Sequence, residues 1–160
     1  MNEFVLARVI HVLCVILWIG GLAMVTTILL PVTMSVPSEE KRTEFFKRFK
    51  KRFAAQARYT TLFTGLSGFY MVHILDAWSR FTEFRYWWMH SMVIIWLLFM
   101  FMLYVMEPRI LHSKIKKQTQ QNSNTVFLAM QRTHWILLLL SLITVIGATA
   151  GSHGWMLSEG

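Results

Sequence analysis

Four histidines that lie within long apolar segments are the residues with the greatest capacity for chemistry: His11, His73, His90 and His153. A neutral imidazole is a strong ligand for heme iron, copper and zinc. An ionisable side chain inside an apolar helix is costly unless it faces a partner. One such histidine is usually only a hydrogen-bonded side chain, whereas four at one depth predict a bound metal or prosthetic group. Whether they share a depth depends on the helices that carry them.

Four apolar segments, each long enough to cross a membrane, alternate with charged stretches: about residues 9–31, 53–75, 86–106 and 134–157. The 160 residues are 55% apolar and 15% charged, with a mean hydropathy of +0.46, which exceeds what a soluble domain of this size needs. A helix rises about 1.5 Å per residue, so about 20 apolar residues span about 30 Å of hydrocarbon. We therefore expect one domain over residues 1–160, an all-α antiparallel four-helix bundle within the membrane.

The distribution of lysine and arginine predicts the orientation of the bundle. Thirteen of the sixteen basic residues lie between the first and second segments or between the third and fourth; the others are Arg8, Arg80 and Arg85. The positive-inside rule places both basic stretches in the cytoplasm and both termini outside, as in a multi-pass protein of a bacterial inner membrane. This explains the net charge of +8 without nucleic acid as a partner. Cys14, the single cysteine, can form no internal disulfide.

A basic amphipathic segment connects the first two apolar segments. Ser38 precedes two glutamates, which is typical of a helix start, and phenylalanines recur at three- to four-residue spacing among lysines and arginines: Phe45, Phe46, Phe49 and Phe53. One interpretation is a docking or lipid-sensing helix. The other, which we favour, is a basic cytoplasmic extension of the second span that contacts anionic headgroups at the inner membrane surface.

This topology predicts that the four histidines share one level near the outer face. His11 and His90 come early in the first and third spans, which run inward, while His73 and His153 come late in the second and fourth, which run outward. Each helix thus offers one imidazole within about two turns of the same face. Two further histidines do not join this group: His134, toward the inner end of the fourth span, and His112, in a cytoplasmic stretch.

A heme requires more than two histidines, and the sequence offers the rest of the set. In a bundle core, small residues leave room for a flat ring, aromatic residues lie beside it, and cations meet the propionates. The small residues are Gly65, Gly68, Gly147 and Gly151; the aromatic residues are Trp18, Tyr70, Trp87, Trp88 and Trp155; the cations are Arg8 and Arg85. Each also has a simpler role in helix packing, the interfacial belt or snorkelling, so the prediction of heme depends on the histidines.

Copper is the alternative ligand. The sequence has eleven methionines, whose thioethers can bind copper, but Met24, Met100 and Met102 lie deep in the spans, where methionine commonly fills the core. A transporter of this kind would receive copper at the histidines and pass it inward by Cys14, Met24 or Met100.

Three stretches of the sequence carry a family resemblance. The first runs from Arg8-Val9-Ile10-His11 through Leu17-Trp18-Ile19-Gly20-Gly21 to Leu30-Pro31, the second comprises Arg52-Phe53, Arg58 and Thr64-Gly65-Leu66, and the third is Trp88-Met89-His90-Ser91-Met92. They resemble, in turn, the first helix of the CopD-like superfamily, its basic-aromatic entry to a helix with a Thr-Gly pair, and the HemJ-type stretch of Trp, spacer, His, spacer and Lys. This superfamily includes the copper resistance D domain and the HemJ-type proteins.

The resemblance implies two activities. HemJ-type proteins bind heme and are linked to the oxidation of protoporphyrinogen, and the copper resistance D domain is associated with copper uptake or tolerance. By position, His11 matches the family's first-helix histidine and His90 its third-helix histidine. The family's lysine is Met92 here, and no arginine stands beside Pro31. Because an anionic tetrapyrrole substrate should need such cations, heme binding is favoured over oxidase activity.

We therefore expect a small cytochrome b-like membrane protein. His11 and His90 are the first-choice axial ligands of heme b, and His73 and His153 are alternatives or the ligands of a second heme. Two-histidine ligation favours electron transfer, between a quinone and an outer partner protein or within a larger complex or homo-oligomer. The alternatives are copper handling, a HemJ-type oxidase, or an accessory subunit in which the histidines are incidental. No nucleotide loop, nucleophile elbow or zinc-protease motif indicates a stand-alone enzyme.

Overall fold

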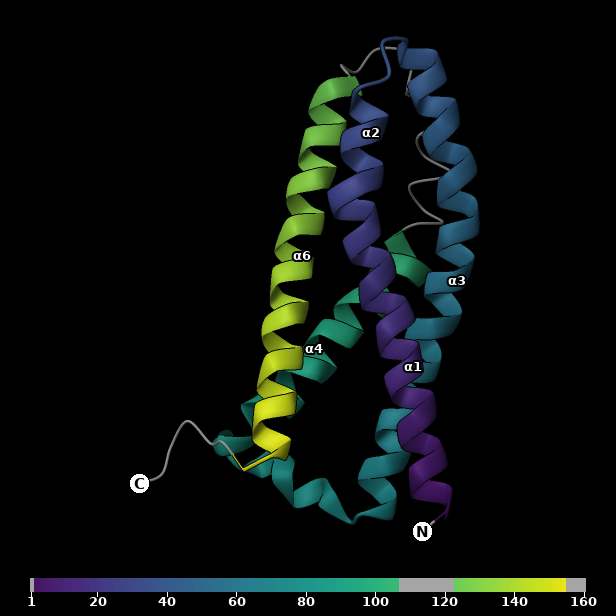
Figure 1. The fold of residues 1–160 in the computed structure, drawn as a ribbon. Coiled ribbons are helices and arrows are strands. Elements are labelled where there is room, and N and C mark those ends of the chain that lie inside the picture. The colour runs from purple at the N-terminus through teal and green to yellow at the C-terminus, as the bar shows by residue number, and fades with distance from the viewer. Residues whose placement is uncertain (1, 107–122, 155–160) are drawn as a thin grey trace.

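The computed structural model describes residues 2–106 and 123–154, which form helices joined by short connections and contain no strands (Figure 1). The elements are α1 (Asn2–Met24), η1 (Val25–Leu29), α2 (Leu30–Met34), α3 (Glu39–Ile74), η2 (Ala77–Thr82), η3 (Phe84–Tyr86), α4 (Trp87–Phe101), η4 (Met102–Met106) and α6 (Ser123–Ser152). The start of α1 and the end of α6 lie at one end of the bundle, called the terminal end below; the opposite end is the loop end.

The first three elements form one continuous helical stretch. The segment η1 is a π-helix that comes directly before Pro31, which has no N–H to donate and whose ring would clash with the carbonyl one turn back. Widening the helix at this point relieves that clash. Buried hydroxyls bond within the helix, with Thr26 Oγ1 donating to the Leu22 carbonyl and Thr33 Oγ1 to the Leu29 carbonyl, each at 2.7 Å. The stretch therefore presents apolar side chains outward and remains helical through Pro31.

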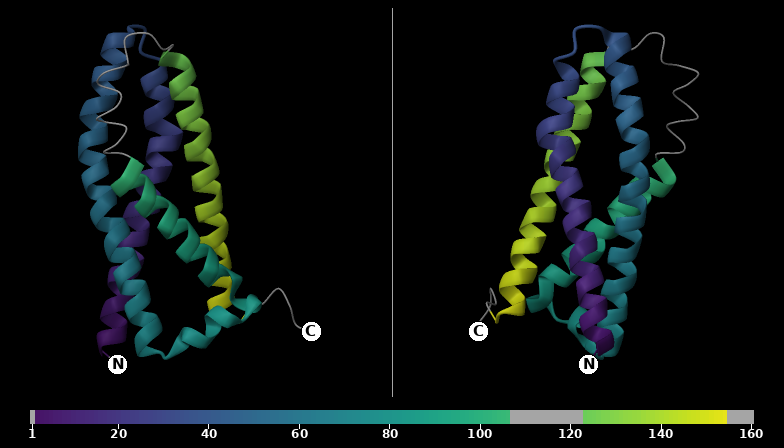
Figure 2. Two further views of the ribbon diagram at one scale, coloured as in Figure 1. Left: turned by 180° about the vertical axis from the view of Figure 1, so that it is seen from behind. Right: turned by 45° about the vertical axis from the view of Figure 1, so that its right-hand side comes forward.

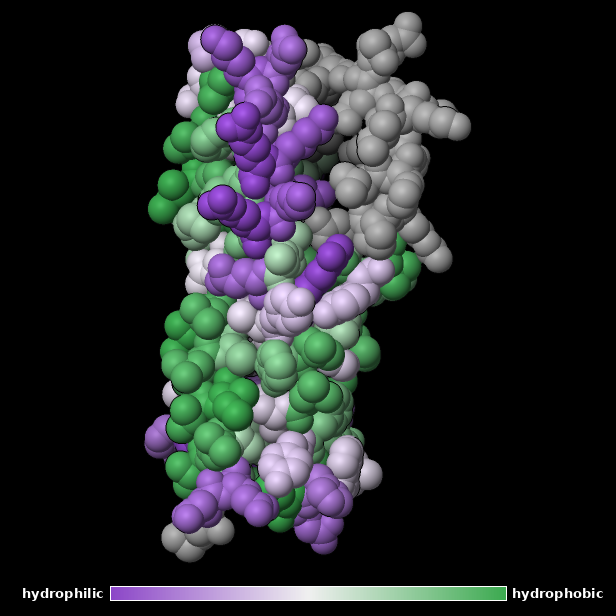
Figure 3. Space-filling view, turned by 90° about the vertical axis from the view of Figure 1, so that its right-hand side faces the viewer, coloured by the Kyte–Doolittle hydropathy of each residue, from purple (hydrophilic) through white to green (hydrophobic). Residues whose placement is uncertain are grey.

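The helix α3 joins the predicted basic segment and the predicted second span into a single element of 36 residues. It begins at Ser38, whose hydroxyl accepts a hydrogen bond from the backbone N–H of Lys41. At about 1.5 Å per residue it is about 54 Å long, well beyond the roughly 30 Å of a bilayer core. Figure 3 shows hydrophilic side chains over the first half of α3 and mostly hydrophobic ones over the second.

Three of the four phenylalanines in the basic half of α3 pack against the protein, and Phe45 is exposed. Phe46, Phe49 and Phe53 contact a buried cluster made of Val25, Leu29, Leu30 and Phe127 at the loop end. Three of these phenylalanines are thus used in this core and are not available to a membrane surface. The structure thus favours the extension of the second span over a separate docking helix.

The helix α4 crosses the bundle obliquely and packs with α6 at the terminal end (Figure 2). A second cluster of buried side chains joins α1, α4 and α6 near their middles: Trp18, Leu22, Phe99, Leu137 and Leu138. The rings of Trp18 and Phe99 meet edge to face with centroids 4.9 Å apart. This cluster holds the two helix pairs, α1 with α3 and α4 with α6, together.

Three helical stretches are long and apolar enough to cross a membrane: Asn2–Met34, Phe84–Met106 and Phe127–Ser152. They correspond to the first, third and fourth predicted spans, so the prediction of an all-helical, multi-span chain is confirmed to that extent. The remaining predicted span, 53–75, falls almost wholly in the second half of α3, which has the length but is richer in polar residues. The predicted cytoplasmic residues Arg109, His112, Lys114, Lys116 and Lys117, and also Trp155, lie outside the described residues.

Candidate functional site

His11, His73 and His90 lie on α1, α3 and α4, and His153 directly follows the end of α6, but their side chains meet different neighbours. His11 and His90 are half-buried, whereas His73 and His153 are exposed. His11 contacts α3, and His90 contacts the connection between α3 and α4. The structure therefore brings the expected residue types toward the terminal end without gathering their rings around one point.

His11 is held by α3 through one ring nitrogen. Its Nδ1 lies 2.9 Å from the carbonyl oxygen of Thr64 and 3.3 Å from the hydroxyl of Ser67. A carbonyl oxygen can only accept, so Nδ1 carries the proton and Nε2 keeps a free lone pair. Gly68 leaves space for the ring, because a Cβ there would lie 3.2 Å from His11 Cε1. Metal-binding histidines commonly have this tautomer and a backbone contact of this kind. His134 and His153 also have a carbonyl oxygen beside Nδ1, one turn back in their own helical stretch, so His11 is distinguished by making this contact to a different helix.

Both ring nitrogens of His90 lie against backbone carbonyls of its own part of the chain, and a neutral ring can donate to one of them, of which Phe81 is the nearer. Its Nε2 lies 2.9 Å from the carbonyl oxygen of Phe81, and its Nδ1 lies 3.3 Å from the carbonyl oxygen of Tyr86. The Phe81 ring also packs edge to face against the imidazole. As placed, His90 does not present a free nitrogen to a ligand on α1, so a heme held between His11 and His90 does not fit this arrangement.

The other two histidines do not complete a site. His153 Nδ1 lies 2.8 Å from the carbonyl oxygen of Thr149, one turn back on α6. The His73 side chain has no hydrogen-bond partner within residues 2–106 and 123–154. Across those same residues, no group of three or more His, Cys, Asp or Glu side chains could hold a metal ion. No described cluster supports a copper ion bound by several imidazoles.

Three of the four glycine positions expected to leave a slot for a flat ring are filled by tryptophans, and the fourth, Gly68, lies against His11. Trp96 lies against Gly65 and donates its indole N–H to the Thr61 carbonyl at 2.8 Å. Trp87 packs against Gly147, and Trp88 packs against Gly151. Glycine permits this close approach because it has no Cβ, so these two seams serve helix packing.

The remaining predicted aromatic residues are used elsewhere. Trp18 belongs to the central core, and the Tyr70 hydroxyl donates to the carboxylate of Glu3 at 3.3 Å. Neither lines an open slot beside His11. Trp18 and Tyr70 therefore contribute to contacts within the fold.

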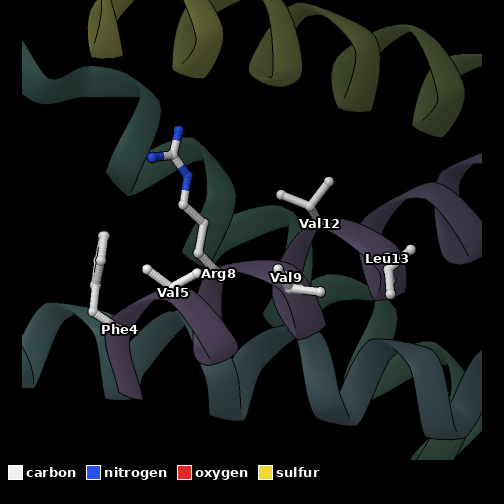
Figure 4. A pocket seen from close by; sticks show the side chains of 6 residues that line it. All are labelled: Phe4, Val5, Arg8, Val9, Val12 and Leu13. Carbon is white, nitrogen blue, oxygen red and sulfur yellow. The ribbon is translucent and has the colours of Figure 1, made fainter. Parts of the chain in front are cut away.

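The two predicted cations differ in their surroundings. Arg85 pairs with the Glu83 carboxylate at 2.5 Å and lies over the Tyr86 ring. Arg8 makes no hydrogen bond, ion pair or ring contact with the described residues. Its side chain points away from α3 and toward α6, over an open groove on α1 (Figure 4). Arg8 is thus the unpartnered cation at the terminal end among the predicted site residues.

Sequence reasoning did not identify the partners of the histidines. Thr64, Ser67 and Gly68 position His11, and the Phe81 carbonyl holds His90. The row of small polar residues on α3, Thr60, Thr61, Thr64 and Ser67, was the available signal, because it marks the side of that helix that packs inside the protein. Backbone carbonyl partners leave no signal in residue type. Comparison with protein-family models, curated proteins and solved structures gave no match.

Proposed function

We propose that this chain is an integral membrane protein of four spans, in which the second half of α3 crosses the membrane in addition to the three long apolar stretches. The antiparallel packing of α3 along α1 supports this arrangement, as does the shared position of the start of α1 and the end of α6. Thr60, Thr64 and Ser67 on this half of α3 face the protein and donate to backbone carbonyls one turn back, and the Thr61 hydroxyl, which has no partner among the described residues, is fully buried, so none of them confronts lipid with a free donor. The basic half of α3 then stands on the cytoplasmic side.

Within this bundle, we propose that His11 binds heme b as an axial ligand. The observation that carries the proposal is its hydrogen bond to the Thr64 carbonyl, which fixes the Nδ1–H tautomer and leaves Nε2 free. The resemblance of the surrounding helix to the CopD-like superfamily points to the same residue. Heme bound there would supply one-electron redox chemistry, which fits a role in electron transfer with a quinone or a partner protein.

The proposal has two forms, which differ in whether His90 holds the heme together with His11. Ligation by His90 requires its Nε2 to leave the Phe81 carbonyl, which costs a hydrogen bond in an apolar setting. Without that exchange, His11 would be the single protein residue that holds the heme. The described residues offer no group of three or more His, Cys, Asp or Glu side chains for copper, and the proposal of heme is based on the tautomer of His11 and on the family resemblance.

An optical experiment on the full chain, purified in mild detergent and supplied with hemin, tests the proposal. We expect a Soret band that sharpens on dithionite reduction and is lost in His11→Ala. The matched control is His134→Ala, because His134 is also half-buried and bonds a backbone carbonyl, that of Met130, at 2.8 Å. Carbon monoxide then reports the second position: a shifted ferrous Soret band indicates an open face, and an unchanged band indicates a second protein ligand. Equal heme retention in His11→Ala and wild type would contradict the proposal.

A further inference from the structure

Arg8 lies on α1 among apolar residues and is exposed. A charged side chain at membrane depth is costly unless a partner compensates it. Within residues 2–106 and 123–154 no carboxylate, hydroxyl or carbonyl accepts from its guanidinium, and no aromatic ring lies beneath it. The fold therefore presents an uncompensated cation about two turns from the start of α1.

The surroundings of Arg8 have the form of a site for a chain-like ligand. A groove of about 390 Å³ is lined by Phe4, Val5, Arg8, Val9, Val12 and Leu13. Apart from Arg8 these side chains are apolar, and Val5, Val9, Val12 and Leu13 are each about half exposed. They follow one another along the helix axis on both sides of Arg8, as Figure 4 shows. The result is one cation beside an apolar strip that is open to the side.

We propose that this groove binds one anionic phospholipid of the surrounding leaflet. The guanidinium of Arg8 donates to the phosphate oxygens, and an acyl chain lies along Val9, Val12 and Leu13. The planar fork of arginine matches phosphate oxygens two at a time, and its position near the terminal end lets it reach the headgroup level. A free phosphate ion would use only the cation and leave the apolar strip uncovered.

The proposal does not depend on the proposed heme. His11 contacts α3 through its ring, while Arg8 points toward α6, so the two side chains serve different sides of α1. Arg85, the other cation proposed from the sequence for a propionate, is already paired with Glu83. Lipid binding at Arg8 can therefore be measured whether or not heme is bound.

Native mass spectrometry of the purified full chain tests the proposal, with palmitoyl-oleoyl phosphatidylglycerol and the corresponding phosphatidylcholine as probes. We expect wild type to retain one phosphatidylglycerol in preference to phosphatidylcholine. Arg8→Gln should weaken this retention about tenfold, as expected for the loss of a charge-assisted hydrogen-bonded pair. Val9→Trp keeps the charge but fills the groove, and it should weaken retention as well. Arg80→Gln removes an exposed cation that lies over the Tyr86 ring and should change nothing.

Three outcomes overturn the proposal. Unchanged retention in Arg8→Gln shows that the guanidinium does not hold the phosphate. Equal loss in Arg80→Gln shows attraction by general charge rather than by a site. Loss of the heme band in Arg8→Gln with normal lipid retention assigns this arginine to the cofactor. If Arg8→Gln does not fold, normal retention of phosphatidylglycerol in Val9→Trp also overturns the proposal, because that variant keeps the arginine and fills the groove.

Discussion

The Nδ1 atom of His11 lies 2.9 Å from the carbonyl oxygen of Thr64, across the interface between α1 and α3. This contact links two segments that are 53 residues apart in the sequence. It orients an imidazole inside the bundle and frees its second nitrogen for a ligand. The proposed chemistry therefore depends on how closely the two helices approach at this level.

The absence of a side chain at Gly68 allows α1 and α3 to approach closely at the level of His11. A Cβ at this position would lie 3.2 Å from Cε1 and 3.4 Å from Nδ1 of His11, so a valine must displace the ring from the Thr64 carbonyl. We expect Gly68→Val to lower heme retention to near that of His11→Ala, measured by the Soret absorbance per protein. Gly20→Val is the control, since a Cβ at Gly20 meets nothing within 4 Å. Normal heme content in Gly68→Val would show that the contact with α3 does not orient the ligand.

Gly65 is predicted to be needed for stability. A Cβ at this position would overlap the indole ring of Trp96, which is also fixed by its hydrogen bond to the Thr61 carbonyl. Gly65→Ala should therefore lower the free energy of unfolding by about 1–3 kcal/mol, the usual cost of overpacking. Thermal unfolding in detergent, followed by circular dichroism, measures the change. Gly20→Ala should be neutral or stabilising, because it removes a flexible helical glycine without a clash.

The core at the loop end should tolerate truncation poorly. The Leu30 side chain is fully buried beside Phe127, while Val32, two residues later on the same helix, is half exposed. Leu30→Ala should lower the free energy of unfolding by about 2–5 kcal/mol, because it leaves a cavity. Val32→Ala should cost much less. Similar unfolding midpoints for the two variants would argue that this end does not form a packed core in the protein.

The crossing of α3 can be tested by thiol labelling. In a Cys14→Ser background, single cysteines replace Lys47, in the basic half of α3, and Ser79, in the connection that follows it; both positions are exposed. A membrane-impermeant maleimide should label Ser79→Cys in intact cells and Lys47→Cys only after permeabilisation, because the positive-inside rule places the basic half inside. Identical labelling of both sites without permeabilisation would mean that α3 does not cross.

The amino-acid sequence by itself determined the helices and the pattern of apolar and basic segments. Long apolar runs cannot leave backbone groups unpaired in lipid, and Ser38 marks the start of α3, so these features follow from local chemistry. The sequence also showed that His11 and His90 lie near the same end of their helices. It favoured the basic segment as an extension of the second span, and the structure shows that α3 continues without a break through both halves, because composition changes along the helix while its backbone does not.

Only the tertiary structure decided which way each side chain turns. His11 faces α3 because Gly68 leaves room there, whereas His90 turns to the Phe81 carbonyl, which residue type cannot reveal. The glycines expected to border a prosthetic group receive Trp87 and Trp88 instead, since a ring from the neighbouring helix fills the same space that a ligand would. Arg8 meets no partner within residues 2–106 and 123–154 because packing angles between helices, not spacing along the chain, determine which polar groups meet.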